Sequence, residues 1–305
     1  MSRQRGGRQR LAGVIDGDPD GPVTVNVGKT MDAVQEDLGF GRYHVILLLI
    51  CGGSRAAYGS VVQMLALVQG CIMLEWGLDD VYESILTGSV FAGQIFGMLA
   101  LGPLADYYGR RPLILVGWLL VVVFGFTACL ATDIWFLITM LTVVGIGLGA
   151  IQALTYDLFL ETTPSKFRSR AVYISLFTVL GELYVIAVAW GGVLSQDGWR
   201  WLAFYTFIPI LVVSVVGFLV MEESAPWLFA QGKIADSEQV LRVIATTNGK
   251  GAGYNVKLKE TNSSATEGES FESFAELFSP KLWDTTLTLW GVQYVSLPPG
   301  LTTEA

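Results

Sequence analysis

Charged residues are scarce in this chain of 305 residues. Asp, Glu, Lys and Arg make up only 15% of the sequence, whereas hydrophobic residues make up 52%. Long apolar runs with so few charges are unsuited to a water-exposed surface and are typical of helices that cross a bilayer. The net charge of -8 comes from acidic residues in predicted loops and tails, and it indicates neither a nucleic acid nor an acidic partner.

Histidine and cysteine are scarcer still, which excludes several kinds of site. The sole histidine, His44, stands where the first apolar run begins, so no mechanism can use two histidines of this chain. Cys51, Cys71 and Cys129 lie inside or at the edge of apolar runs and lack CxxC spacing. We therefore expect no metal site, no cofactor and no disulfide framework, and we interpret the thiols as buried and inert. Nothing resembles a catalytic triad or a phosphate-binding loop, so we do not expect an enzyme.

Six apolar stretches are long enough to cross the hydrocarbon core, which requires about 20 residues per helix. They cover residues 43–74, 82–101, 112–130, 134–155, 171–194 and 201–221. The sequence thus predicts an all-α membrane protein with a six-helix transmembrane bundle over residues 43–221. Residues 1–42 are predicted to form a cytoplasmic tail, residues 222–282 a cytoplasmic central loop with an amphipathic helix near 235–246, and residues 283–305 a truncated seventh segment and tail.

The basic residues predict the orientation, because Lys and Arg are enriched in cytoplasmic loops. With the N-terminus in the cytoplasm, 17 of the 19 basic residues lie on the cytoplasmic side, Arg200 lies on the other side, and Arg55 lies inside the first span. Acidic residues gather on the side of Arg200, at positions 75, 79, 80, 83, 133 and 197. We expect both ends of the bundle to be cytoplasmic. The sequence does not choose between the plasma membrane and an intracellular vesicle.

The connector between the second and third spans carries the sharpest motif. Residues 102–111 read GPLADYYGRR, which resembles the major facilitator superfamily signature GxxxD[RK]xGR[RK], in the connector where that family carries it. The matching residues are Gly102, Asp106, Gly109, Arg110 and Arg111. Glycines let helix ends meet closely, and the charged groups can form a network that locks or releases a conformation. The alternative is that these arginines only cap membrane helices.

Shorter segments resemble the synaptic-vesicle-2-related branch of that superfamily, in matching order. They are LGFGRYH at 38–44 and GWRW at 198–201, and they are followed by ESAPWL at 223–228, which resembles the element after span six of sugar and organic-ion porters. The resemblance covers roughly residues 31–290 and implies the N-terminal half of a twelve-helix fold. It also implies that Glu161 neighbours the signature arginines. We therefore expect an Arg110–Glu161 contact within a cytoplasmic charge network that includes Arg168.

Three positions inside the spans depart from the family pattern. Relatives carry a D-x-x-E pair in span one, where this chain has Tyr58 and Val61. The basic residue that relatives place before the span-four glycines corresponds to Thr142. Carboxylates inside the membrane are natural proton or cation sites, so proton coupling lacks its usual residues here.

Glycines recur at positions 145, 147 and 149 inside the fourth span. No strand precedes them, and no acidic residue stands at the distance that a ribose contact requires, so a dinucleotide site is not expected. We expect these glycines to permit close helix packing.

Two ionisable residues stand at membrane depth, Arg55 in span one and Glu182 in span five. A charge at the bilayer centre costs roughly 2.5–3.5 kcal/mol on insertion scales, so such residues usually face a cavity or a partner. We hypothesise that Arg55 and Glu182 face each other or share a cavity with Tyr58, and that Arg55 contacts an anionic group of the substrate. The alternative is that both charges snorkel or pair without a functional role.

The resemblance implies a secondary transporter that works by alternating access of two six-helix bundles. Its partners would be the lipid bilayer and a small solute such as an organic ion, a sugar or a vitamin. The alternative is a truncated, non-transporting membrane fragment or a subunit that pairs with a second half-transporter, because residues 297–305 resemble a family tail joined after a deletion. A homodimer that rebuilds twelve helices is disfavoured, since one half would have to supply the contacts of the other.

Overall fold

The computed structural model describes residues 30–193, 198–250, 258, 283 and 288. Within these ranges the chain is built from helices of very different lengths. They are α1 (Met31–Leu38), α2 (Arg42–Trp76), α3 (Asp80–Tyr108), α4 (Arg110–Ala128), α5 (Ile134–Thr162), the 3-10 helix η1 (Ser165–Ala171), α6 (Val172–Val188), the π-helix η2 (Ala189–Val193), α7 (Trp199–Val220), α8 (Ala225–Ala230) and α9 (Ile234–Thr247).

Six helical segments are long and apolar enough to span a membrane, and they confirm the six predicted spans. Five of them are α2, α3, α4, α5 and α7, and the sixth runs over Ser165–Gly191 through η1, α6 and part of η2. The helices α3 and α5 continue for two turns past their predicted ends, because hydropathy marks contact with lipid and not the end of a helix. Gly109, with φ of 105°, ends α3. The extended residue Thr163, before Pro164, ends α5.

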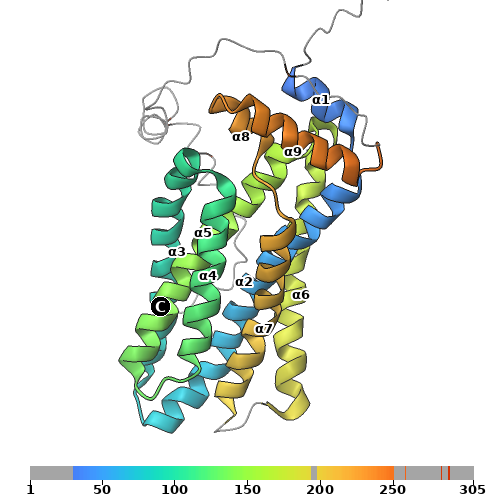
Figure 1. Ribbon diagram of the computed structural model, residues 1–305. Coiled ribbons are helices and arrows are strands. Elements are labelled where there is room, and N and C mark those ends of the chain that lie inside the picture. The colour runs from blue at the N-terminus through green and yellow to red at the C-terminus, as the bar shows by residue number, and fades with distance from the viewer. Residues whose placement is uncertain (1–29, 194–197, 251–257, 259–282, 284–287, 289–305) are drawn as a thin grey trace, which may run out of the picture.

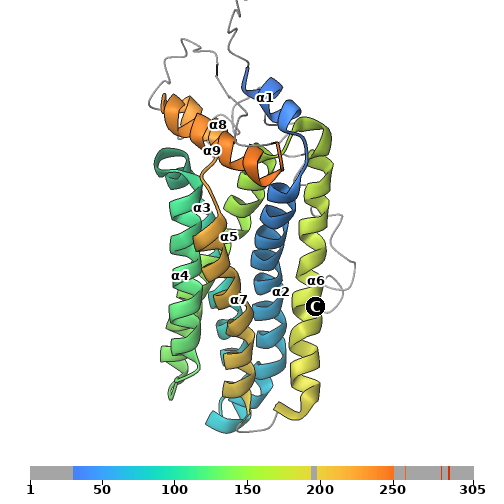
Figure 2. The same ribbon diagram turned by 45° about the vertical axis from the view of Figure 1, so that its right-hand side comes forward.

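The spans form two groups of three that lie side by side along their length (Figures 1 and 2). In one group α5 packs against α3 and α4, and in the other α2 packs against α6 and α7. Contacts of α4 with α7 and of α2 with α5 join the two groups. The short helices α1, α8 and α9 gather at one end of the bundle, beside the turn between α3 and α4.

Glycines set the close approach of α3 to α5. A Cβ atom added at Gly93 of α3 would overlap the carbonyl oxygen of Thr142, and one added at Gly149 of α5 would overlap that of Gln94. Gly145 lies equally close to the backbone of α3 at Val90. The prediction that the span-four glycines permit close helix packing is therefore confirmed.

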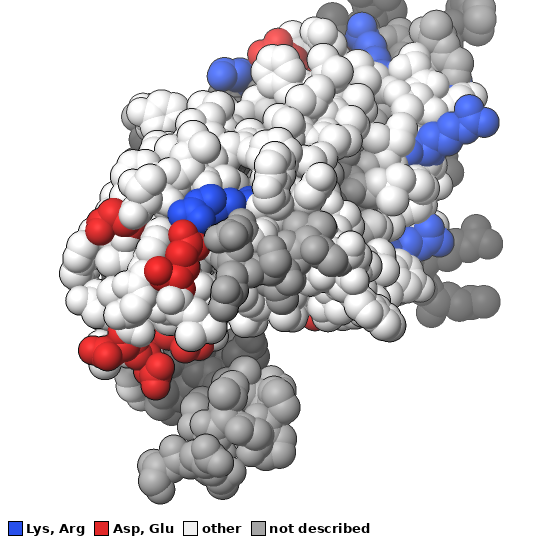
Figure 3. All heavy atoms as spheres, turned by 90° about the horizontal axis from the view of Figure 1, so that it is seen from below, with Lys and Arg blue, Asp and Glu red and all other residues white. Residues whose placement is uncertain are grey.

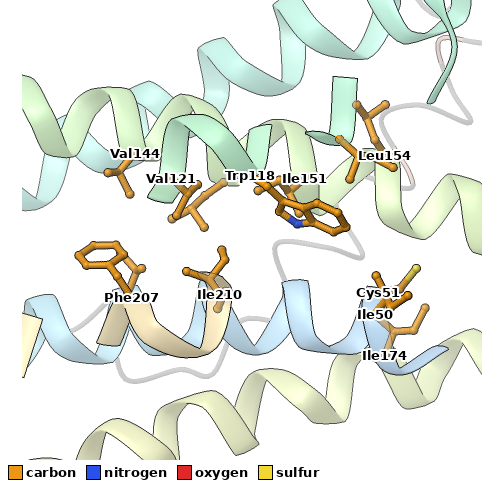
Figure 4. Packing of buried hydrophobic residues seen from close by; sticks show 14 of the residues in the cluster. Ile50, Cys51, Trp118, Val121, Val144, Ile151, Leu154, Ile174, Phe207 and Ile210 are labelled. Atoms are coloured by element: carbon orange, nitrogen blue, oxygen red, sulfur yellow. The ribbon is translucent and has the colours of Figure 1, made fainter. Parts of the chain in front are cut away.

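Aromatic side chains fill the seam between the two groups. Trp118 of α4 and Phe207 of α7 are fully buried, and Figure 4 shows the Trp118 indole beside Ile151 of α5. The indole N–H of Trp118 donates a hydrogen bond of 3.1 Å to the hydroxyl of Ser54, so this buried polar group is satisfied. Large apolar side chains also cover the outside of the bundle, as lipid contact requires.

The segments outside the spans are more ordered than their sequence suggested. The predicted amphipathic helix is present as α9, and its residues Val240, Leu241 and Ile244 are buried as expected. The helices α1 and α8 were not predicted, because helices of eight and six residues carry too few turns for a clear periodicity. Most of the predicted seventh segment lies outside the described residues.

Candidate functional site

The turn between α3 and α4 brings charged side chains from four parts of the chain together. Here the "charge network" denotes Asp106, Arg110, Glu161, Glu223 and Ser224, and the "network end" denotes the end of the bundle that carries it. This end also holds α1, α8 and α9 (Figure 1).

Arg110 is the centre of the charge network. Its guanidinium forms an ion pair of 2.7 Å with Asp106 of α3 and one of 2.9 Å with Glu161 of α5. It also donates hydrogen bonds to Glu161 through Nε (3.1 Å) and to the carbonyl of Ala105 (3.0 Å). The predicted contact between Arg110 and Glu161 is therefore present. One largely buried guanidinium, with 14% of its side chain exposed, ties the ends of three spans together.

Glu223, which follows α7, caps the beginning of α4. Its carboxylate accepts hydrogen bonds from the backbone N–H groups of Arg110 (3.0 Å) and Arg111 (3.2 Å). A carboxylate is favoured at this position because a helix N-terminus carries partial positive charge and unpaired N–H groups. Gly109 makes the room, since a Cβ atom there would overlap the Glu223 carboxylate.

Ser224 and α8 complete the charge network. The Ser224 hydroxyl donates a hydrogen bond of 2.5 Å to Glu161 and accepts one of 3.2 Å from the backbone N–H of Trp227. The indole of Trp227 in turn donates to the carbonyl of Asp106 at 2.8 Å. Sequence reasoning singled out the ESAPWL segment but gave its side chains no role. No local spacing places them opposite a turn more than 100 residues away.

The side chains of Arg111 and Arg168 do not join the charge network within the described residues. The guanidinium of Arg111 lies 3.9 Å from Glu222 and donates to the carbonyl of Phe218 at 3.4 Å. Arg168 is exposed, and the described ion pairs and hydrogen bonds do not include it. Gly102 lies inside α3, where an added Cβ atom would meet open space. The expectation that Gly102 serves close packing is therefore wrong for the described part of the chain.

A second set of contacts joins α1, α2, α5 and α9 at the network end. The side chain of Asn248, just after α9, accepts a hydrogen bond of 3.0 Å from the backbone N–H of Tyr43 at the start of α2. Gln35 of α1 donates to the carbonyl of Glu161 at 2.8 Å, and His44 lies 3.3 Å from the carbonyl of Thr162. These contacts hold the first turn of α2 beside the last turn of α5.

Arg55 and Glu182, the two ionisable residues at membrane depth, do not form an ion pair with each other among the described residues. Both side chains are partly buried. Gly181 faces α2 and lies against the backbone of Ala56. Glu182 follows it by one residue, which turns its side chain about 100° away from that contact. The Arg55 guanidinium instead lies 5.8 Å from the ring centre of Tyr58.

The opposite end of the bundle carries a smaller cluster. Arg200 forms an ion pair of 2.9 Å with Glu75, donates to the carbonyl of Ala131 at 3.1 Å and stacks on Trp199. Glu75 also accepts a hydrogen bond from the indole of Trp199. Figure 3 shows this face, on which acidic side chains gather around a small basic patch. Among the described residues, no group of His, Cys, Asp or Glu is placed to hold a metal ion.

Comparisons with known proteins place these features in context. The family model described as "Sugar (and other) transporter" matches residues 45–297. The SVOPL protein of Mus musculus is 30% identical over 271 residues, which cover 86% of this chain and 51% of the relative. The organic cation/carnitine transporter 7 of Arabidopsis thaliana is 27% identical over 299 residues, 88% of this chain and 59% of the relative. The synaptic vesicle 2-related protein of Bos taurus is 28% identical over 265 residues, 86% and 46% of the two chains.

Solved structures of the same architecture are also similar. The partially occluded, inward-open xylose transporter XylE from E. coli gives a TM-score of 0.60 at 20% identity, over 67% of this chain and 56% of that one. The proton:xylose symporter XylE bound to 6-bromo-6-deoxy-D-glucose gives 0.57 at 20% identity, over 67% and 51%. These likenesses show the fold. The chain spans about half the length of the curated relatives it matches.

Proposed function

Because the chain belongs to the sugar (and other) transporter family of the major facilitator superfamily, we propose that its bundle is one half of a secondary transporter. The whole transporter moves a small organic solute by alternating access, in which two six-helix units rock around a central site. The relatives named above include a transporter of organic cations and carnitine and a symporter of xylose. Organic ions and sugars are therefore the solute classes to test first.

The charge network is the observation that carries this proposal. It joins α3, α4, α5 and the segment after α7 through one arginine and three carboxylates, so it holds these helix ends to one another. Asp106 is its most open acidic member, with 47% of its side chain exposed. In the proposed cycle the network end faces the cytoplasm, as the distribution of basic residues predicts. The network holds one arrangement of the bundle and releases it when Asp106 or Glu161 exchanges partners.

A second candidate follows from the length of the match. A solute site between two six-helix units needs both units, and this chain spans about half of its relatives. The chain would then be a non-transporting fragment, or a subunit that transports only beside a second half, which could be another copy of itself. Native mass spectrometry of the purified chain in detergent separates a monomer from a dimer.

Uptake into liposomes tests the leading proposal. The purified chain is reconstituted, and entry of labelled xylose, carnitine and nicotinate is compared with entry into protein-free liposomes. We expect saturable uptake of at least one solute, with a lower rate for Arg110→Gln and an unchanged rate for Arg242→Gln on the exposed face of α9. If the inserted chain moves none of the solutes and is monomeric, transport by this chain is contradicted, and the subunit or fragment proposal takes its place.

A further inference from the structure

Arg55 lies deep in the bundle. The contact of His44 with Thr162 marks the level at which α2 begins and α5 ends. Arg55 follows His44 by eleven residues, which at 1.5 Å per residue places it roughly 16 Å along α2. A hydrocarbon core is roughly 30 Å thick, so Arg55 lies well inside the membrane-spanning helix α2 and not at its end.

The neighbours of Arg55 on α2 contact other helices of the bundle. Gly53 packs against Val213 of α7, and Ala56 packs against α6. The hydroxyl of Ser54 accepts a hydrogen bond from Trp118 of α4. Arg55 follows Gly53 by two residues, which places it on the side of α2 opposite α7.

Two tyrosines share this part of the molecule with Arg55. Tyr58 lies three residues further along, on the same face of α2, and its ring is the one that the Arg55 guanidinium approaches. Tyr156, on the neighbouring helix α5 that packs against α2, is 38% exposed. Two helices that pack against each other thus present a cation and two phenol groups together.

No anion accompanies this cation among the described residues. Their ion pairs leave Arg55 out, and α2 contains no Asp or Glu before Glu75, near its far end. A guanidinium at this depth is costly unless a cavity or a counter-charge compensates it. A bound anion would therefore compensate the charge of Arg55 and reduce this cost.

We propose that Arg55, with Tyr58 and Tyr156, recognises a carboxylate of the solute, so that this protein binds an organic anion with a flat or apolar body. The proposal rests on the proposed function, because it names the solute class of the same transport site. A guanidinium offers N–H donors in a fork that matches both oxygens of a carboxylate. The tyrosine hydroxyls add hydrogen-bond donors, and the tyrosine rings can pack against an apolar part of the solute. A neutral sugar offers no charge that would compensate Arg55.

Equilibrium binding tests this proposal without requiring transport. The full chain is placed in lipid nanodiscs, and binding of labelled benzoate is measured alone and in competition with benzamide, benzylamine and phenylphosphonate. We expect saturable binding in the millimolar range or tighter, competition by unlabelled benzoate, and none by benzamide or benzylamine. Competition by phenylphosphonate stronger than by benzoate would overturn the assignment of a carboxylate.

Variants at one position identify the binding group. Arg55→Gln should weaken benzoate binding by about tenfold or more, which corresponds to about 1.4 kcal/mol. Arg55→Lys should retain part of the affinity, which also shows that a substituted position 55 folds. The matched control, Arg242→Gln, removes an exposed guanidinium from α9 and should leave binding unchanged. Equal binding by the wild type and Arg55→Gln, or no saturable binding by the wild type, would overturn the proposal.

The result is independent of the transport assay. Binding that depends on Arg55 without uptake into liposomes would contradict the proposed transport and support the anion site. Uptake of a neutral solute without benzoate binding would support the proposed transport and contradict the anion site.

Discussion

Arg110 and Arg55 are partly buried arginines of the same bundle, but their surroundings differ. Arg110, at the network end, forms ion pairs with Asp106 and Glu161 and a hydrogen bond to a backbone carbonyl. Arg55, inside α2, lies 5.8 Å from the ring centre of Tyr58 and has no carboxylate partner among the described ion pairs. Because a buried charge needs compensation, a satisfied arginine indicates a structural or conformational role, whereas an unsatisfied one indicates a ligand.

The largest expected effect is at the network end. Gly109→Ala should lower the free energy of unfolding by about 1–3 kcal/mol, because the backbone at φ of 105° and ψ of 159° is accessible to glycine and costly for alanine. The added methyl group would also displace the Glu223 carboxylate from the start of α4. Unfolding of the purified chain, followed by tryptophan fluorescence, measures the loss.

Gly102→Ala is the matched control within the same motif. The Cβ atom meets open space there, and alanine is favoured over glycine in a helix by roughly 0.5–1 kcal/mol. Stability should rise or stay level. Equal destabilisation at positions 102 and 109 would show that the Glu223 cap does not explain the requirement for glycine.

A double-mutant cycle measures the coupling energy between Arg110 and Glu161. Arg110→Gln and Glu161→Gln should each cost about 1–3 kcal/mol, because each leaves a charged partner partly unsatisfied. The double variant should cost less than the sum, with a coupling energy of about 0.5–3 kcal/mol. Strict additivity in the same unfolding assay would show that the 2.9 Å ion pair contributes nothing measurable.

Arg55→Gln should act in the opposite way on stability. Removal of a charge without a counter-ion relieves its desolvation, so the free energy of unfolding without ligand should be unchanged or higher by about 1 kcal/mol. The same unfolding measurement, repeated with saturating benzoate, should stabilise the wild type and not the variant. A loss of stability as large as that of Arg110→Gln would remove the contrast between the two arginines.

The smallest expected effect is at Tyr58. Tyr58→Phe keeps the ring near the Arg55 guanidinium and removes only the hydroxyl, whose hydrogen bond contributes about 0.5–1.5 kcal/mol. Benzoate affinity should therefore fall a few-fold, less than for Arg55→Gln. Titration in the same nanodiscs compares the two variants, and an effect larger than that of Arg55→Gln would place the main recognition on the tyrosine.

The sequence was informative wherever one-dimensional patterns decide the outcome. Hydropathy predicted the six spans, helical periodicity predicted α9, and the family motif predicted the contact between Arg110 and Glu161. The sequence was uninformative where the rotation of a helix about its axis determines which side chains meet. Gly181 faces α2, but Glu182, one position later, does not meet Arg55.

The Glu223 cap could not be predicted from the sequence, for a different reason. It depends on the position of the segment after α7 relative to α4, which side-chain packing of the spans sets and no short motif encodes. The open space at Gly102 is likewise a property of the packed bundle.

The role of Arg55 in solute transport can be measured by uptake of labelled benzoate into liposomes, for the wild-type chain and Arg55→Gln in matched preparations. We expect saturable uptake by the wild type and its loss in the variant, while both proteins remain folded and inserted. Equal uptake by the two proteins would contradict the role of Arg55 in carrying an anionic solute, and no uptake by either would contradict transport of benzoate by this chain.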